Sequence, residues 1–136
     1  MNMDKDLLTN IAERLYGVEL LDEIPTGNPT SRVYEAAAGQ NRYILKVQEF
    51  SERRASHMEF ETGWVEYLSC HMAGIAKIAA SRAGRAWETA SVGQERLILS
   101  LQEKVEGKII DINDPDEFNS RLFKRLGRVM GQMHSL

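Results

Sequence analysis

The segment that decides the fold is "NRYILKVQEF", residues 41–50, in which apolar side chains surround a lysine. Its apolar residues are typical of a buried β-strand, and they are Tyr43, Ile44, Leu45 and Val47. Lys46 lies among them, and an ammonium group removed from water costs free energy unless a partner compensates. Either Lys46 extends to solvent from an edge strand, or it has a partner inside the protein.

The helix predicted after this strand contains a candidate partner. Ser56, with Glu59 three residues later, forms a capping box that predicts the helix start, and Gly74 predicts its end. Apolar residues at steps of three and four mark one face of this helix, and they are Met58, Val65, Leu68 and Met72. Glu61 falls in the same stripe. Two interpretations stay open: Lys46 and Glu61 form an internal ion pair, or Glu61 lies at the border of the stripe while Lys46 reaches solvent.

The remaining pattern predicts an α+β fold with a five-stranded antiparallel sheet. Strands are predicted at 18–24, 32–38, 42–47, 85–92 and 95–105, with turn formers such as "PTGNP" between them. A short N-terminal helix ends at Gly17, and the helix after the third strand is expected to pack on the sheet. A C-terminal helix is predicted from Asp114, which forms a second capping box with Pro115 and Glu117.

Composition restricts the classes of partner. Hydrophobic residues make up 43% and charged residues 27% of the 136 residues, as in globular domains. The 17 basic and 20 acidic side chains give a net charge of -3, which indicates no nucleic-acid partner. A single cysteine, Cys70, excludes an internal disulfide and fits a reducing compartment. Because no apolar run approaches the ~18 residues of a membrane span and no signal peptide is recognised, we expect a cytoplasmic protein without membrane contact.

Other chemistry-bearing residues predict no separate site. Three histidines and the cysteine lie at spacings that match no metal-binding pattern: His57, His71, His134 and Cys70. Trp64 and Trp87 are predicted to lie in the core. We therefore expect no metal ligands in these residues.

In order and spacing, the motifs together resemble a known family. "SRVYEAAAGQNRYILKV" is similar to a strand–turn–strand that ends in a phosphate-binding lysine, and "EFETGWVEYL" to a helix with a glutamate seven residues before a leucine. "RLILSLQEKVEG" is similar to the strand and hinge between two lobes, and "LFKRLGRVMGQMHSL" to the helix that follows. The chain thus resembles the N-terminal, ATP-binding lobe of the aminoglycoside phosphotransferase and choline kinase-like family, relatives of protein kinases. The resemblance implies a kinase-like N-lobe over residues 1–105 and a hinge, linker and first helix of a second lobe over 106–136.

The resemblance also implies roles for individual residues. Lys46 would contact the α- and β-phosphates of ATP and would be oriented by Glu61. Val33 would cover the adenine. The adenine edge would meet the hinge, where the Glu103 carbonyl and the Val105 amide would make hydrogen bonds. Two further hinge residues would lie beside them, Gln102 and Lys104.

The loop "TGNPTSR", residues 26–32, would cover the phosphates. The hydroxyl of Thr30 or Ser31, with backbone amides, would replace the glycines of protein kinases. Only Gly27 is present, however, and Pro29 removes an amide donor. An ordinary turn is the alternative interpretation.

No catalytic residue is expected in these 136 residues. In the family, the aspartate that positions the attacking hydroxyl and the Mg²⁺ ligands lie in "HGD…N" and "D" motifs after the last helix, whereas His134 is followed here by Ser135. The implied function is that of the ATP-binding lobe of a small-molecule O-phosphotransferase, truncated before its catalytic lobe. It would act on a hydroxyl of an aminoglycoside or other metabolite, with Mg²⁺ bound only together with that lobe. The alternative is a catalytically inactive kinase-like module for binding or oligomerisation.

The apolar stripe of the C-terminal helix predicts self-association. Its residues recur at helical spacing, and they are Phe118, Leu122, Leu126, Val129, Met130 and Met133. A contiguous exposed apolar face usually finds a partner. We therefore expect a homo-oligomer through this helix.

Overall fold

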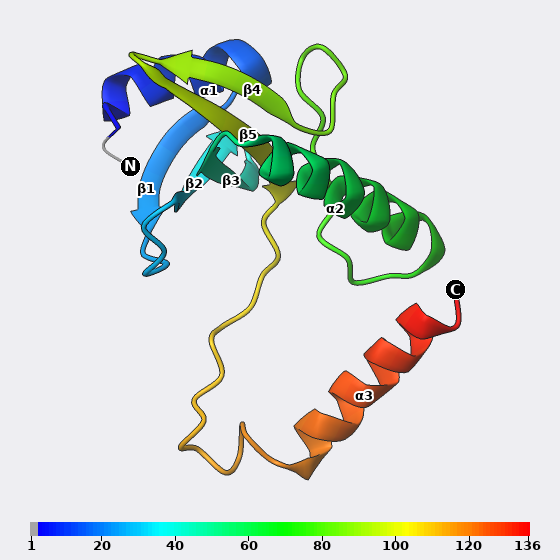
Figure 1. Cartoon of the computed structure of the whole chain (residues 1–136). Helices are drawn as coiled ribbons and strands as arrows, with labels where there is room; N and C mark the ends of the chain where they lie inside the picture. The colour runs from blue at the N-terminus through cyan, green and yellow to red at the C-terminus, as the bar shows by residue number, and fades with distance from the viewer. Residues whose placement is uncertain (1–2) are drawn as a thin grey trace.

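The computed structural model describes residues 3–136 and contains a five-stranded antiparallel sheet with the strand order β1-β2-β3-β5-β4 (Figure 1). The strands are β1 (Glu19–Ile24), β2 (Ser31–Ala38), β3 (Asn41–Glu49), β4 (Glu88–Val92) and β5 (Glu95–Glu103). The helices are α1 (Lys5–Tyr16), α2 (Glu52–His71) and α3 (Ser120–His134). The predicted fold class, α+β with a five-stranded antiparallel sheet, is confirmed.

One face of the sheet forms the core with α1. Side chains alternate between the two faces of a strand, so Leu45 and Val47 of β3 point to the same side. Both are fully buried, as are Leu97 and Leu99 of β5 and Leu8 of α1. Burying large aliphatic side chains of this kind stabilises a fold by roughly 1.5–3 kcal/mol each.

The C-terminal end of α1 joins a distant loop. Gly17 has φ 67°, a left-handed conformation that glycine adopts without steric cost, and its amide donates to the Glu13 carbonyl. The guanidinium of Arg82 pairs with the Glu13 carboxylate at 3.1 Å, and the Arg82 amide donates to the Leu15 carbonyl at 2.8 Å. Because a Cβ at position 17 would lie 2.8 Å from this guanidinium, glycine serves both the turn and the close approach.

The opposite face of the sheet carries Lys46 and is covered by α2. The side chain of Gln48, two residues after Lys46, donates to the Met58 sulfur of α2 at 3.5 Å. Figure 1 shows α2 crossing in front of the sheet, with α1 behind it. The two helices therefore lie on opposite faces, and the Lys46 face is the more polar of the two.

The predicted N-termini of two helices are wrong. Helix α2 begins at Glu52, because the Ser51 hydroxyl accepts from the Arg54 amide at 3.1 Å, one turn before the predicted cap at Ser56. Helix α3 begins after Asn119, whose side chain accepts from the Leu122 amide at 3.1 Å. Asp114, the predicted cap, instead accepts from the Asp116 amide in a turn before the helix. In both cases another polar side chain satisfies the free amides of the first helical turn.

The other element limits differ from prediction in smaller ways. Helix α2 ends at His71, where extended Met72 follows it, rather than at Gly74. The predicted strands at 85–92 and 95–105 are shorter, and cover only β4 and β5 as given above. Trp64 is 42% exposed and stacks on Tyr67 at a centroid distance of 5.8 Å, so its prediction as a core residue is wrong.

Helix α3 follows the sheet after a linker. None of its residues is buried, and the apolar side chains of one face are exposed: Phe123, Leu126, Val129 and Met130. We call these four residues the α3 face.

In the linker before α3, Lys108 and the Asp111 amide donate to the Glu117 carboxylate, and both hydrogen bonds hold the pKa of Glu117 below its usual range. None of the helices in the described part of the chain has the length and apolar character needed to cross a bilayer.

Candidate functional site

Lys46 lies half-buried at the centre of the sheet. The register pairs it with Val33 on β2 and with Ser100 on β5, so the three side chains stand side by side on one face. Gln102 pairs with Ile44 and therefore shares this face. The structure thus brings together three predicted site residues, Lys46, Val33 and Gln102.

Ser100 is a neighbour of Lys46 that the sequence analysis missed. It is 6% exposed and occupies the one polar position of "LILSL", residues 97–101. Like Lys46, Ser100 is a polar residue within an apolar strand, and this is the signal that indicates it in the sequence.

Glu61 lies at the border of the buried stripe of α2. Thr62 is only 3% exposed, and its hydroxyl donates to the Met58 carbonyl at 2.7 Å, whereas Glu61 is exposed. Among the residues that the structure describes, no ion pair within 4.0 Å involves Lys46 or Glu61. Of the two interpretations, the internal ion pair is therefore not formed in this structure.

The end of β5 is held from both sides. The Glu103 amide donates to the Lys77 carbonyl at 2.9 Å, and the Lys104 amide to the Arg42 carbonyl at 3.0 Å. The ammonium of Lys104 also pairs with the Glu35 carboxylate at 3.1 Å. The predicted hinge is therefore well anchored up to Lys104.

Val105 is the first residue beyond these anchors. Its side chain is 61% exposed, and across residues 3–136 its amide N–H has no protein acceptor. The Gln102 side chain, by contrast, already donates to the Ala76 carbonyl at 3.0 Å. The geometry thus leaves a backbone donor available to a ligand at Val105.

The loop before β2 is closed by its own side chains. The Asn28 side-chain oxygen accepts from the Thr30 amide at 3.0 Å and from the Thr30 hydroxyl at 3.1 Å. The Asn28 amide donates to the Thr26 hydroxyl at 3.3 Å. Ser31 is buried at the start of β2. The bond from the Thr30 amide closes an Asx turn, which Asn28 favours in such a loop, and the hydroxyl bond is additional, so both donors of Thr30 are in use.

Titratable clusters add no metal centre to this region. Within the described part of the chain, no three His, Cys, Asp or Glu side chains are placed to hold a metal ion. A cavity of about 680 Å³ lies between α2 and the segment that enters β4, and none of the predicted nucleotide residues lines it.

A five-stranded antiparallel sheet with a lysine on its central strand and a helix across the lysine face is the arrangement expected from the resemblance to a kinase-like N-terminal lobe. No family model matches the chain. The chain is 33% identical over 105 residues to the amicoumacin kinase of Bacillus subtilis (strain 168), a match that covers 76% of this chain and 30% of that protein. It is therefore homologous to amicoumacin kinase, and the predicted resemblance is confirmed.

Solved structures agree with this result. An amicoumacin kinase in complex with AMP-PNP, Ca²⁺ and Ami has a TM-score of 0.75 and 28% identity, over 97% of this chain and 39% of that chain. A microcompartment-associated aminopropanol kinase has a TM-score of 0.70 and 20% identity, over 97% of this chain and 40% of that one. A spectinomycin phosphotransferase in complex with ADP and spectinomycin has a TM-score of 0.67 and 14% identity, over 96% of this chain and 37% of that one. The last two proteins share less than 25% identity with this chain, so their similarity shows only that the fold is shared. The chain spans only 30–40% of the length of these proteins.

Proposed function

We propose that this chain is the ATP-binding lobe of a small-molecule O-phosphotransferase. The observation that carries the proposal is the homology to amicoumacin kinase, together with the nucleotide analogue AMP-PNP in the solved amicoumacin kinase, which covers 97% of this chain. The complete enzyme would transfer the γ-phosphate of ATP to a hydroxyl of an aminoglycoside or other hydroxylated metabolite. Cys70 is a free thiol, which supports a cytoplasmic location.

Lys46 and Glu61 would act on the phosphates. Lys46 is a half-buried cation without a carboxylate partner among the described residues, and a phosphate oxygen would supply the missing anion. Glu61, exposed on α2, would orient the ammonium once the nucleotide is bound. Val33, beside Lys46, would cover the adenine.

The hinge and the loop before β2 would complete the nucleotide contacts. The Glu103 carbonyl and the free Val105 amide would bind the adenine edge, beside Gln102. Ser31, or Thr30 after release from Asn28, would face the phosphates. Residues 1–105 would then form the N-lobe, and residues 106–136 would lead into a second lobe.

The catalytic acid and the metal ligands would come from that second lobe. Phosphoryl transfer in kinases uses an aspartate to position the hydroxyl, and an acid and an asparagine to hold the metal. The solved amicoumacin kinase contains Ca²⁺. We propose Mg²⁺ as the metal in the complete enzyme, and assign no ligand to it within residues 3–136.

Removal of the Lys46 ammonium should weaken nucleotide binding. A hydrogen bond to a charged group contributes about 1.5–3 kcal/mol, so Lys46→Ala is expected to raise the dissociation constant for AMP-PNP by roughly tenfold or more. Isothermal titration calorimetry measures this effect, with circular dichroism as a check that the variant folds. Lys77→Ala is the matched control, since that lysine is exposed and only its carbonyl is hydrogen-bonded. Equal affinities of Lys46→Ala and the wild type would contradict the assignment.

A second candidate function rests on α3. A catalytically inactive kinase-like module would work through protein contacts, and the α3 face is an exposed apolar surface suited to them. We propose that this face mediates self-association. The absence of AMP-PNP binding to the wild type, together with a stable oligomer, would favour this function over the first.

Charge placed on the α3 face should dissociate the oligomer. Leu126→Lys adds an ammonium to the apolar face and is expected to shift the protein to monomer in sedimentation velocity experiments. Gln132→Lys adds the same charge to an exposed position of α3 outside the α3 face and should leave the oligomer intact. A wild type that stays monomeric at high concentration would refute self-association.

A further inference from the structure

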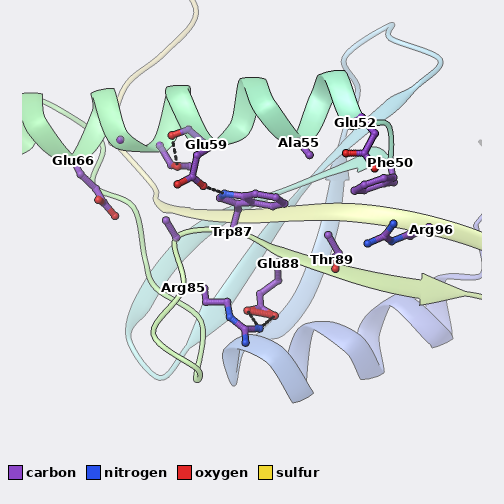
Figure 2. A pocket seen from close by; sticks show the side chains of 13 residues that line it. Phe50, Glu52, Ala55, Glu59, Glu66, Arg85, Trp87, Glu88, Thr89 and Arg96 are labelled. Atoms are coloured by element: carbon purple, nitrogen blue, oxygen red, sulfur yellow. Dashed lines mark hydrogen bonds and ion pairs between the residues drawn. The ribbon is translucent and has the colours of Figure 1, made fainter.

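The cavity between α2 and β4 has the size of a small-molecule site. Its volume is about 680 Å³, within the range of roughly 300–1,000 Å³ that such sites occupy. One wall is α2, the other is the segment 85–89, and Phe50 and Arg96 close one end (Figure 2). We call it the α2–β4 cavity.

This cavity is separate from the proposed nucleotide site. Glu59 and Glu66 of α2 line it, and residues seven apart share one face of a helix. Glu61 lies two positions after Glu59, which places it on nearly the opposite side of α2. A ligand in the cavity would thus contact α2 without touching Glu61 or Lys46.

The cavity has an aromatic wall held in a fixed position. In Figure 2 the ring of Trp87 extends beneath α2, and its indole N–H donates to Glu59 at 2.9 Å. At the closed end, the Arg96 guanidinium lies 3.8 Å from the centroid of the Phe50 ring. Arg96 thus occupies the Phe50 ring, and Trp87 is the aromatic ring of the lining that remains for a ligand, whose cationic group an aromatic face attracts.

The charges that line the cavity favour a cation. Its lining includes four carboxylates, of Glu52, Glu59, Glu66 and Glu88, and the two guanidinium groups of Arg85 and Arg96. Arg85 pairs with Glu88 at 3.1 Å, which neutralises that carboxylate. Among the described residues, Glu52 and Glu66 take part in no ion pair. An excess of negative charge therefore remains beside the aromatic wall.

Gly63 leaves part of the helical wall open. It lies within α2, where glycine is less favourable than alanine, and it lines the cavity. A Cβ built at this position meets no atom within 4 Å. A Cβ there displaces no atom, and because Gly63 lines the cavity we expect a larger side chain at this position to occupy part of it.

We propose that the α2–β4 cavity is a binding site for a small organic cation, an amine or guanidine on an aromatic or aliphatic body. The body packs on Trp87, and the cationic group lies between Glu59 and Glu66. The proposal rests only on the lining residues and charges of the α2–β4 cavity, and it does not require that the chain bind a nucleotide.

The probe for the test is 2-phenylethylamine, compared with the neutral 2-phenylethanol and the anionic 3-phenylpropionate. Titrations are followed by the Trp87 indole N–H resonance in nitrogen-edited NMR spectra, because this group lies in the cavity wall. The amine is expected to shift the resonance saturably, with a dissociation constant on the order of 1 mM, and to bind at least about tenfold more tightly than the alcohol. Addition of AMP-PNP should not displace it.

Three variants locate the site. Glu59→Gln combined with Glu66→Gln should weaken amine binding by about tenfold, the loss of a charge-assisted contact. Gly63→Leu should fill the cavity and abolish the shift, while a thermal stability no lower than that of the wild type shows that the fold is retained. Glu19→Gln, on exposed β1, removes the same kind of charge and should change nothing. The proposal is overturned if the alcohol binds as tightly as the amine, if Gly63→Leu binds normally, or if the amine causes no shift.

Discussion

Replacement of Leu99 by alanine is expected to lower the free energy of unfolding by about 3–4 kcal/mol, a value within the range for fully buried leucines. Leu99 is 0% exposed and lies on β5, between its partners Val47 on β3 and Glu88 on β4. The surrounding strands restrict collapse around the missing atoms, so the cavity penalty adds to the lost transfer free energy. Urea denaturation followed by circular dichroism measures the change.

Leu7→Ala is the matched control for this variant. It deletes the same atoms from a side chain that is 44% exposed on α1. Exposed substitutions usually change stability by no more than about 0.5 kcal/mol. Equal losses in the two variants would mean that the core does not lie between the sheet and α1.

Tyr16→Phe is expected to flatten the alkaline limb of the stability profile. Burial first, and the charge of Glu88 second, raise the pKa of the Tyr16 phenol well above its ordinary value. The phenol therefore stays neutral in the folded protein at a pH where it ionises in the unfolded chain. Its contribution is complete below about pH 10 and is lost as the pH rises further, by about 1.4 kcal/mol for each unit between the two pKa values.

The same variant also loses a hydrogen bond at neutral pH. The Tyr16 hydroxyl donates to the Leu99 carbonyl at 3.1 Å, and removal of such a bond costs about 1 kcal/mol. Urea midpoints measured at about pH 8 and about pH 11 separate the two effects. Tyr67→Phe, on the exposed side of α2, makes the same chemical change and should follow the wild type. A Tyr16→Phe profile parallel to that of the wild type would contradict the raised pKa.

The sequence predicts the sheet well because strand burial is a local signal. Leu45 and Val47 alternate with Lys46, and the core side of β3 follows from this alternation alone. The presence of Lys46 on the central strand, beside Val33, also follows once the strands are ordered as a meander. The strand limits are less predictable, since residues 85–87 belong to a loop tied by Arg85 and Ser81.

Periodicity alone does not decide whether Glu61 or Thr62 lies in the buried stripe of α2. A stripe through Met58, Val65 and Leu68 admits either residue 61 or residue 62 at its centre, and threonine gives a weak apolar signal. The structure selects Thr62, because its hydroxyl bonds back to the helix and its methyl group can be buried. The α2–β4 cavity could not be predicted at all. Phe50, Trp87 and Arg96 come from three separate segments, and no local pattern joins them.

The borders of the sheet also affect how the protein behaves at high concentration. An open β-strand is a template on which a second chain can pair and aggregate. Edge strand β1 has a register irregularity between Leu20 and Glu23, and edge strand β4 is only five residues long. Where β5 extends past β4, Ile78 forms a β-bridge to Gln102 and covers that side of the strand. Strand-to-strand polymerisation, the usual route to amyloid-like precipitates, is therefore disfavoured at every edge.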